Sequence, residues 1–321
     1  METRLNVHGV AVSITSNEEI ASWLDHDYGY YSHPAESAPS LKLNIHLEAP
    51  PYGGLPELAA SRYHEDYIVY DSEGLRVIDF LGRALSVYKT RENTVDIYSE
   101  SQDRLYDVFH LSFESLLGEK LDRKGFHRIH CLGLEKNGMG IIILLPPGGG
   151  KTTMALKFLE SRIGVLSEDM VLYKNDRLYG LHFRWGVKGA TTMKGRLMRR
   201  EKYEDKTLIS TKDMKLSTEA KPKAILLGRR VLSDRSEIKT LPKHKLIKPL
   251  LKSMVLGLEL QQSLAYFLLR STKDGFSKTT IGLSRLKAMR RILRASSTYE
   301  FHIGSDIEKN YKTLAGFLEG L

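Results

Sequence analysis

The stretch IIILLPPGGGKTT, from Ile141 to Thr153, decides the expected fold of this chain. Five apolar residues run into two prolines and three glycines, and a Lys-Thr pair follows directly. A continuous apolar run is typical of a strand buried on both faces, and a helical pattern follows at 153–160. A buried strand, a glycine-rich loop and a helix opened by Lys-Thr form the context of a phosphate-binding P-loop.

Each residue type in this loop has a physical role in holding a triphosphate. Glycines let backbone N–H groups turn toward phosphate oxygens, and the helix N-terminus adds partial positive charge. We expect Lys151 to reach the β and γ phosphates and Thr152 to ligate Mg²⁺. The loop departs from the usual pattern at Leu145, where the first glycine is expected. The alternative to a phosphate-binding loop is a glycine-rich turn with an incidental lysine. The expected nucleotide-binding residues are Gly148, Gly149, Gly150, Lys151, Thr152 and Thr153.

An acidic pair follows the loop helix. Glu168 and Asp169 lie late in an expected strand at Gly164–Tyr173. Strand ends converge on the phosphate crevice in a doubly wound sheet, so one carboxylate can hold Mg²⁺ while the other accepts a hydroxyl proton. The alternative is a pair of acids at a strand end that faces water.

A histidine precedes the loop. His130 lies on an expected strand, His127–Lys136, which the Asn137-Gly138 turn joins to the strand Met139–Leu145 that feeds the loop. His127 and His130 are three residues apart in an extended segment, so their side chains face opposite ways and a shared zinc site is disfavoured. The alternative for His130 is a structural, hydrogen-bonded histidine.

The remaining pattern predicts two domains, a mixed α+β domain at 1–120 and the nucleotide-binding domain at 121–321. Ser16 with Glu19 predicts a capping box for a short helix at Ile20–Leu24. Ser305 with Glu308 predicts the same for a last helix at Asp306–Leu318. Residues Lys188–Lys221 read as a long polar excursion. Further strands are expected at Leu41–Leu47, Tyr67–Tyr70, Leu75–Phe80, Ala84–Lys89, Thr94–Tyr98, Leu178–Phe183, Ala224–Leu227 and Tyr299–Ile303, and helices at Arg104–Leu117, Leu246–Leu269 and Ser284–Ala295.

Bulk composition narrows the function classes. The 321 residues include one cysteine, Cys131, which excludes an internal disulfide and favours a reducing compartment, so we expect a cytoplasmic protein. Charged residues interrupt the first twelve positions and no 18-residue apolar span occurs, so neither export nor membrane insertion is expected. Positive charge is concentrated between Gly186 and Glu300, with 27 Lys and Arg against 10 Asp and Glu. This excess favours anionic partners without identifying them.

Together these residues resemble the active site of HPr kinase/phosphorylase and its wider HPr-kinase-like family. In that family an upstream strand histidine, a glycine-rich loop ending in Gly-Lys-Ser/Thr, and an acidic pair form one site. The matching residues here are His130, Gly148–Thr152, and Glu168 with Asp169, and the resemblance covers about Gly125–Tyr173 well and the C-terminus weakly. It implies an α/β P-loop kinase domain of the HPr kinase C-terminal type, preceded by a smaller α+β domain.

The resemblance also implies ATP and Mg²⁺ as cofactors. Glu168 stands where the family has its first aspartate, Thr153 replaces the acidic residue of HPr kinases proper, and their downstream glycine-rich signature is absent. The chain is more similar to relatives found beside peptide-modification systems, some of which phosphorylate a serine of a ribosomal peptide. The implied roles are catalysis by Asp169, Glu168, His130 and Lys151, and metal binding by Thr152 and Asp169.

The implied activity is therefore transfer of the γ-phosphoryl group of ATP to a serine hydroxyl in a peptide or protein, by a chain that can assemble with itself. One alternative is a regulatory module that binds nucleotide without transferring phosphate. A third reading is a nucleic-acid-associated ATPase, which we disfavour because aromatic residues are not interleaved with the basic run and no later apolar strand ends in Asp-Glu.

Overall fold

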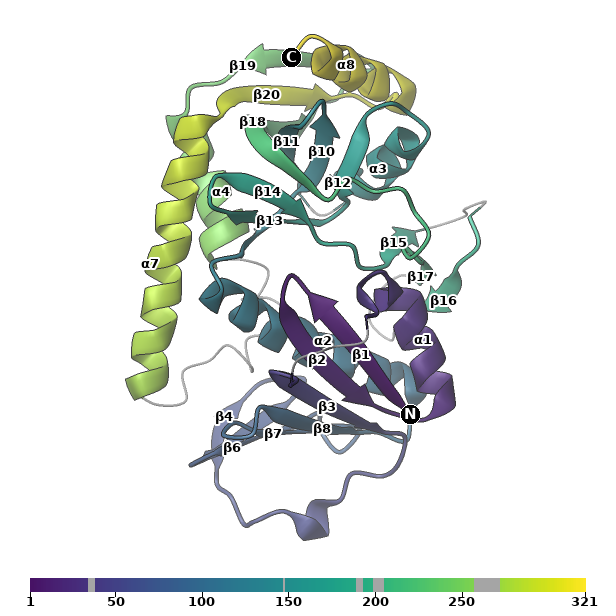
Figure 1. Cartoon of the computed structure of the whole chain (residues 1–321), viewed down its shortest axis with the longest axis vertical. Helices are drawn as coiled ribbons and strands as arrows, with labels where there is room; N and C mark the ends of the chain where they lie inside the picture. Colours follow the sequence, from purple (N-terminus) through teal and green to yellow (C-terminus); the bar gives the residue numbers. More distant parts are fainter. Residues whose placement is uncertain (34–37, 147, 189–192, 199–204, 257–271) are drawn as a thin grey trace. The chain divides into compact units, whose positions relative to one another are not determined.

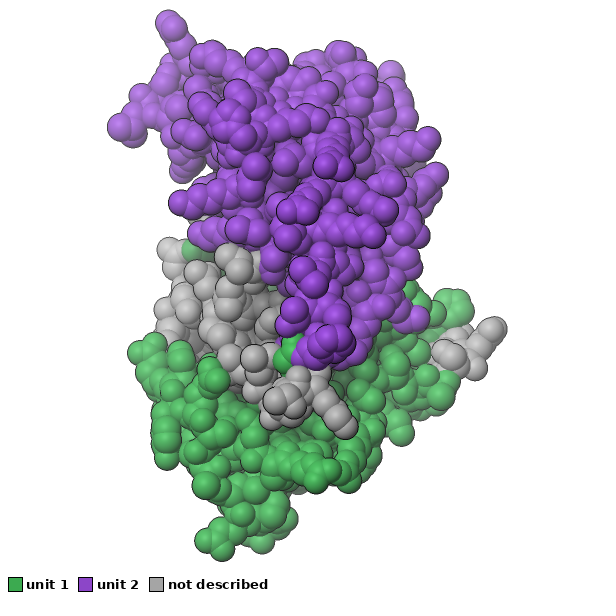
Figure 2. Space-filling model, turned by 90° about the vertical axis from the view of Figure 1, so that its left-hand side faces the viewer, with its two compact units in different colours: residues 1–121, 188–212, 259–275 green, residues 122–187, 213–258, 276–321 purple. Residues whose placement is uncertain are grey.

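The chain forms two compact units, each of mixed α/β structure (Figure 2). The computed structural model describes residues 1–33, 38–146, 148–188, 193–198, 205–256 and 272–321 (Figure 1). The first unit contains residues 1–121, 188–212 and, of the described residues before Phe276, 272–275. The second is built from 122–187, 213–258 and the segment from Phe276 onward. The second unit is therefore not the continuous stretch 121–321 that the sequence led us to expect, because the chain returns to the first unit within it.

The first unit is built on one eight-stranded sheet, with the strand order β1-β2-β3-β8-β7-β6-β5-β4. β2, β3 and β8 pair in parallel, and the other neighbours pair antiparallel. The strands are β1 (Glu2–Val7), β2 (Val10–Thr15), β3 (Leu41–His46), β4 (Ala60–Tyr63), β5 (Ile68–Ser72), β6 (Leu75–Asp79), β7 (Leu85–Lys89) and β8 (Thr94–Tyr98). Two further short strands of this unit, β16 (Arg196–Met198) and β17 (Lys206–Ile209), pair with each other.

Two helices of this unit pack through aromatic side chains. In α1 (Glu18–Tyr28) and α2 (Gln102–Arg123), Trp23 meets Phe109 with ring centroids 5.4 Å apart, and Tyr28 meets Phe113 at 4.9 Å. The residue that caps α1 is Asn17, whose side chain accepts a hydrogen bond from the Ile20 N–H. The expected Ser16 capping box is therefore wrong by one residue.

The second unit contains the strand that leads into the glycine loop. Its sheet has the order β12-β10-β11-β18-β14-β13-β9, and β20 joins on β18 with β19 beside it. The strands are β9 (His127–His130), β10 (Leu132–Lys136), β11 (Met139–Leu144), β12 (Gly164–Ser167), β13 (Met170–Lys174), β14 (Arg177–Gly180), β18 (Glu219–Arg230), β19 (Glu237–Thr240) and β20 (Ser297–Ile303), with β15 (Trp185–Lys188) following β14 in the chain. The helices are α3 (Lys151–Leu159), α4 (His244–Leu250), a π-helical turn at Leu251–Leu256, α7 (Thr272–Ala295) and α8 (Ile307–Glu319).

β11 is buried on both faces, as its unbroken apolar run predicts. Ile142 and Leu144 face one core, which α4 and α7 complete with residues such as Leu246 and Ile292. The alternate side chains Ile141, Ile143 and Leu145 face a second core, which α3 and α8 complete. Helices therefore cover both sides of the central strands, and this packing fixes the direction in which β11 enters the glycine loop (Figure 1).

Three expected elements of this unit differ in the structure. The expected strand His127–Lys136 is two strands that separate at Cys131, because β9 pairs with β13 whereas β10 pairs with β11. The expected strand Gly164–Tyr173 is likewise two, β12 and β13, with the acidic pair between them. The cap of α8 is the Asp306 carboxylate, which accepts from the N–H groups of the first turn, and not Ser305.

Parts of two predicted segments lie outside the described residues. Of the expected helix Leu246–Leu269, residues 257–269 are not described, and the preceding part forms α4 and the π-helical turn. Of the polar excursion Lys188–Lys221, the described parts contain β16 and β17. Among the helices of the described residues, none has the length and apolar character needed to cross a bilayer.

Candidate functional site

The glycine loop has a backbone that other residues would adopt only with strain. Gly148 and Gly150 have φ values of +72° and +91°, in the left-handed region that favours glycine. At Gly149 the restriction is space, since an added Cβ would lie 2.8 Å from the Pro146 carbonyl oxygen. That oxygen accepts a hydrogen bond of 2.9 Å from the Gly149 N–H, which closes the turn. The three consecutive glycines are therefore explained by the turn itself.

The loop leads directly into α3, whose first N–H groups have no side-chain cap. Gly150 is the N-cap, and because glycine has no side chain it cannot satisfy the N–H groups of the first turn. These groups and the helix dipole together favour a bound anion at this end of α3. Gly148 and Thr153 are exposed beside this end, while Lys151 is buried. The loop thus fits a phosphate group in both backbone direction and charge.

Lys151, His130 and Asp169 form one cluster at the start of α3. Lys151 Nζ lies 3.0 Å from His130 Nε2 and 3.5 Å from Asp169 Oδ1. The same carboxylate oxygen lies 3.5 Å from His130 Nδ1. The Lys151 side chain is only 8% exposed, whereas that of Asp169 is 47% exposed. A buried ammonium group therefore has one carboxylate near it that also faces solvent.

The contacts of His130 favour one neutral tautomer. An ammonium group can only donate, so His130 Nε2 accepts from Lys151 and the ring proton is assigned to Nδ1, facing Asp169. Burial lowers the pKa of His130 below its ordinary value, and the Lys151 charge lowers it further, while Asp169 acts in the opposite direction. A neutral histidine beside the lysine ammonium has a lower electrostatic energy than a protonated histidine in the same place.

Thr152 and Glu168 form a second pair in the site. The Thr152 hydroxyl donates a hydrogen bond to Glu168 Oε1, and Glu168 is buried. A hydroxyl oxygen and a carboxylate oxygen in contact are a pair of metal ligands that suits Mg²⁺. This ion usually takes one or two protein oxygens and completes its coordination shell with phosphate and water. No group of three or more His, Cys, Asp and Glu gathers to hold a metal within the described ranges. The residues therefore fit a magnesium ion that arrives with a phosphate ligand.

Neighbouring strands bring the histidine and the acids to the loop. Met170 is opposite His130 in the pairing of β13 with β9, and the Cys131 N–H donates to the Asp169 carbonyl oxygen at 3.1 Å. Ser167 Oγ accepts from the Met170 N–H at 3.3 Å, which closes the turn that holds the acids. The backbone thus fixes the relative positions of His130 and Asp169.

The route by which the acids reach the loop differs from our expectation. We expected them at the end of a strand parallel to β11, and His130 on the strand that pairs with β11. Instead, Glu168 and Asp169 occupy the turn between β12 and β13, and β12 pairs antiparallel with β10. His130 ends β9, which pairs with β13 and not with β11. The same residues meet, but through the turn and not through parallel strand ends.

A buried ionic network that the sequence did not suggest anchors the other end of β9. His127 Nδ1 lies 2.8 Å from Asp122 Oδ1, and His127 Nε2 lies 2.9 Å from Ser284 Oγ. Arg285 Nε donates to the same Asp122 oxygen at 3.0 Å, and a second guanidinium nitrogen reaches the other oxygen. Asp122 and Arg285 are 163 residues apart, so no local sequence pattern could indicate their pairing. For His127, the sequence predicted only that its side chain faces away from His130, as it does.

Comparisons with known proteins do not assign the chain to a family. No family model matches it, and a search of curated proteins finds no significant relative. The likeness to HPr-kinase-like proteins therefore rests on the residues of this site, and the function must be argued from their chemistry.

Proposed function

We propose that this protein is a cytoplasmic, Mg²⁺-dependent phosphotransferase that moves the γ-phosphoryl group of ATP to a serine hydroxyl of a peptide or protein. The observation that carries the proposal is the buried Lys151 ammonium at the end of the glycine loop, within 3.5 Å of a solvent-facing carboxylate, Asp169. Phosphoryl transfer needs little covalent chemistry from the protein, so positioning and charge are the main requirements.

The first requirement is neutralisation of the phosphates. Lys151 and the N–H groups at the start of α3 would hold the β and γ oxygens, with His130 keeping the ammonium in place by accepting from it. Thr152 and Glu168 are the residues that would hold the metal, because their oxygens are already in contact. Bound Mg²⁺ would supply charge neutralisation between the phosphates.

The second requirement is activation of the acceptor. Asp169 is the exposed acid of the pair, so it is the residue that an incoming hydroxyl can reach. The serine oxygen would form the new bond to the γ phosphorus as the bond to the β,γ-bridging oxygen breaks, and the serine proton would pass to Asp169. This proposal makes Asp169 the base and Glu168 the metal ligand, whereas the family resemblance implied metal binding by Asp169.

One observation supports a second candidate, a module that binds nucleotide without transferring phosphate. Leu145 replaces the first glycine of the usual loop, and its side chain packs so closely on Gly228 that an added Cβ there would lie 2.2 Å from Leu145 Cδ2. The start of the loop is thereby fixed to β18. This departure from the usual loop permits binding without transfer.

Transfer from labelled ATP to a library of serine peptides tests the proposal. We expect Mg²⁺-dependent labelling that is lost in Lys151→Met and Asp169→Asn. Lys157→Met is the matched control, because Lys157 lies on the same helix, half-buried and paired with Glu308 outside the site. Retention of full transfer by Lys151→Met would contradict the mechanism, whereas tight ATP binding without transfer to any peptide would favour the second candidate.

A further inference from the structure

A cavity lies at the end of the central sheet, outside the Lys151 site. Its volume is about 600 Å³, and its walls come from Arg230 at the end of β18, from the following residues 231–234, and from Gly304 and Ser305 after β20. Pockets for small organic ligands have volumes of ~300–1,000 Å³, so the cavity is large enough for a nucleoside. Nothing in the phosphate-loop mechanism uses these residues.

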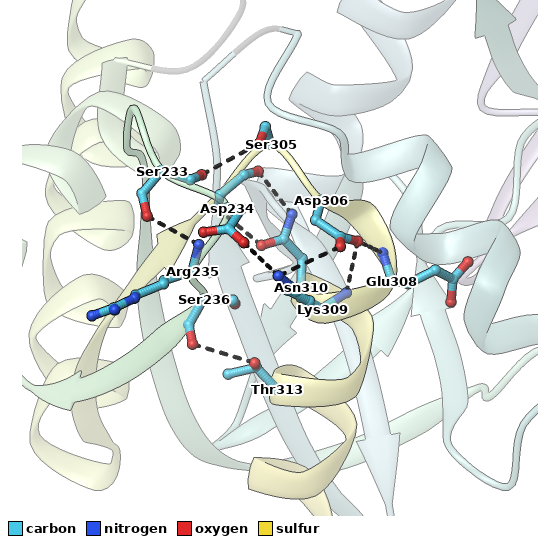
Figure 3. Close-up of polar contacts among 11 residues, drawn as sticks. Ser233, Asp234, Arg235, Ser236, Ser305, Asp306, Glu308, Lys309, Asn310 and Thr313 are labelled. Atoms are coloured by element: carbon cyan, nitrogen blue, oxygen red, sulfur yellow. Dashed lines mark hydrogen bonds and ion pairs between the residues drawn. The ribbon is translucent and has the colours of Figure 1, made fainter.

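The walls of the cavity are held by a dense set of hydrogen bonds (Figure 3). The Ser305 N–H donates to the Ser233 carbonyl oxygen at 2.8 Å, and Asn310 fixes Gly304 by accepting from its N–H and donating to its carbonyl. An added Cβ on Gly304 would lie 2.6 Å from the Arg235 carbonyl oxygen, so only glycine fits there. The cavity is therefore formed by a defined loop pair.

The cavity is on the same edge of the sheet as the phosphate loop. β11 pairs in parallel with β18, and β18 pairs in parallel with β20, so all three strands end at this edge. A Cβ on Gly228 would lie 2.2 Å from Leu145 Cδ2 and 3.1 Å from Ile303 Cδ1, which brings the residues before the two loops together. Five residues lead from Gly228 to Ser233, a path of at most about 17 Å along an extended chain.

The chemistry of the walls suits a base and a ribose. Val231 and Leu232 offer aliphatic surface, and Leu232 is fully exposed at the tip of its loop. Ser233 and Ser305 add hydroxyl groups. The exposed Arg230 side chain makes no ion pair or hydrogen bond within the described part of the chain, whereas its neighbour Arg229 is paired with Glu300. An uncommitted guanidinium can stack on a base or meet a phosphate oxygen.

We propose that this cavity binds the nucleoside part of the triphosphate whose phosphates lie in the Gly148–Thr152 loop. The inference rests on the proposed function, because it uses the same ligand. It adds that nucleoside contacts, and not the triphosphate alone, contribute to affinity through the segments after β18 and β20. Ligands in open α/β sheets bind outside the carboxyl ends of the strands, which agrees with this place.

Photolabelling with 8-azido-ATP locates the base directly. Trypsin releases Val231–Arg235 from one wall and Ala295–Lys309 from the other, so mass spectrometry can assign the label. We expect ATP-protected label in one or both peptides. ATP-protected label confined to other peptides would overturn the inference while leaving nucleotide binding in place.

Comparison of ATP with tripolyphosphate, each with Mg²⁺, separates the nucleoside from the phosphates. We expect ATP to bind more tightly, and Leu232→Ser to weaken ATP about fivefold without changing tripolyphosphate, as expected for one lost aliphatic contact. Leu283→Ser, at an exposed leucine of α7, is the matched control and should change neither. Equal affinity for the two ligands would overturn the inference, and binding of neither would overturn the proposed function itself.

Discussion

Replacing Arg285 by methionine should lower the unfolding free energy of the second unit by about 3–5 kcal/mol, the usual cost of breaking a buried ion pair from one side. The Arg285 side chain is 3% exposed and that of Asp122 is 0% exposed. Methionine keeps most of the apolar length but leaves the Asp122 carboxylate buried, with His127 in contact and one Arg128 nitrogen 3.9 Å away. The loss is therefore dominated by a buried charge that has lost its closest cation.

The matched control is Arg177→Met. Arg177 also pairs with a carboxylate, Glu219, but the two side chains are 42% and 46% exposed. Exposed pairs contribute about 0–1 kcal/mol because water already solvates both charges. The two substitutions remove the same chemical group, so the difference between their effects on the unfolding free energy measures the effect of burial.

Urea unfolding followed by tryptophan fluorescence measures both variants. The chain has two tryptophans, Trp23 in the first unit and Trp185, buried in the second, so a Trp23→Phe background reports the second unit alone. With a slope of about 2 kcal/mol per molar urea, the Arg285 variant should unfold at a midpoint lower by about 1.5–2.5 M. In an Asp122→Asn background the same substitution should cost much less, because the charge it leaves behind is gone.

Equal midpoints for Arg285→Met and Arg177→Met would refute this reasoning. So would full additivity of the Asp122 and Arg285 substitutions, because it would show that the two groups do not interact in solution.

Three further outcomes are expected. Burial alone would raise the pKa of Asp122, but hydrogen bonds from His127 and Arg285 and nearby positive charge hold it below its ordinary 3.8. The stabilisation that the paired Asp122 carboxylate provides is present above that ordinary pKa and is lost as pH falls below it. Acid unfolding should therefore be less steep in Asp122→Asn than in the parent chain. Gly150→Ala should cost about 1–2 kcal/mol of stability, as should Gly138→Ala, which also has positive φ, but only the former should weaken ATP binding. Thr152→Val should lower Mg²⁺-dependent ATP affinity about tenfold while Thr152→Ser retains it; unchanged magnesium dependence in calorimetry would contradict the proposed role of Thr152 as a metal ligand beside Glu168.

Local signals in the sequence predicted much of the second unit. The predicted Asn137-Gly138 turn has two positive φ values and joins the antiparallel strands β10 and β11, as its residues indicate. The apolar run of β11 is a strand buried on both faces. These features depend on near neighbours, so one sequence suffices to find them.

Features that depend on distant partners could not be predicted. The break at Cys131 arises because β9 and β10 join different strand partners, which no local pattern encodes. The Asp122–Arg285 pair is equally remote in sequence. By contrast, β1 and β2 were missed although alternating apolar residues flank the His8-Gly9 turn, so a signal for that hairpin was present.

The proposed mechanism requires that the loop ending in Lys151 bind a magnesium nucleotide. Isothermal titration of Mg·ATP into the full chain measures this binding, with Lys151→Met and the control Lys157→Met beside it. We predict saturable binding that weakens about a hundredfold in Lys151→Met, the cost of a lost charged hydrogen bond to phosphate, and stays unchanged in Lys157→Met. Binding by Lys151→Met that equals the parent chain, or no binding by the parent chain, would contradict the account.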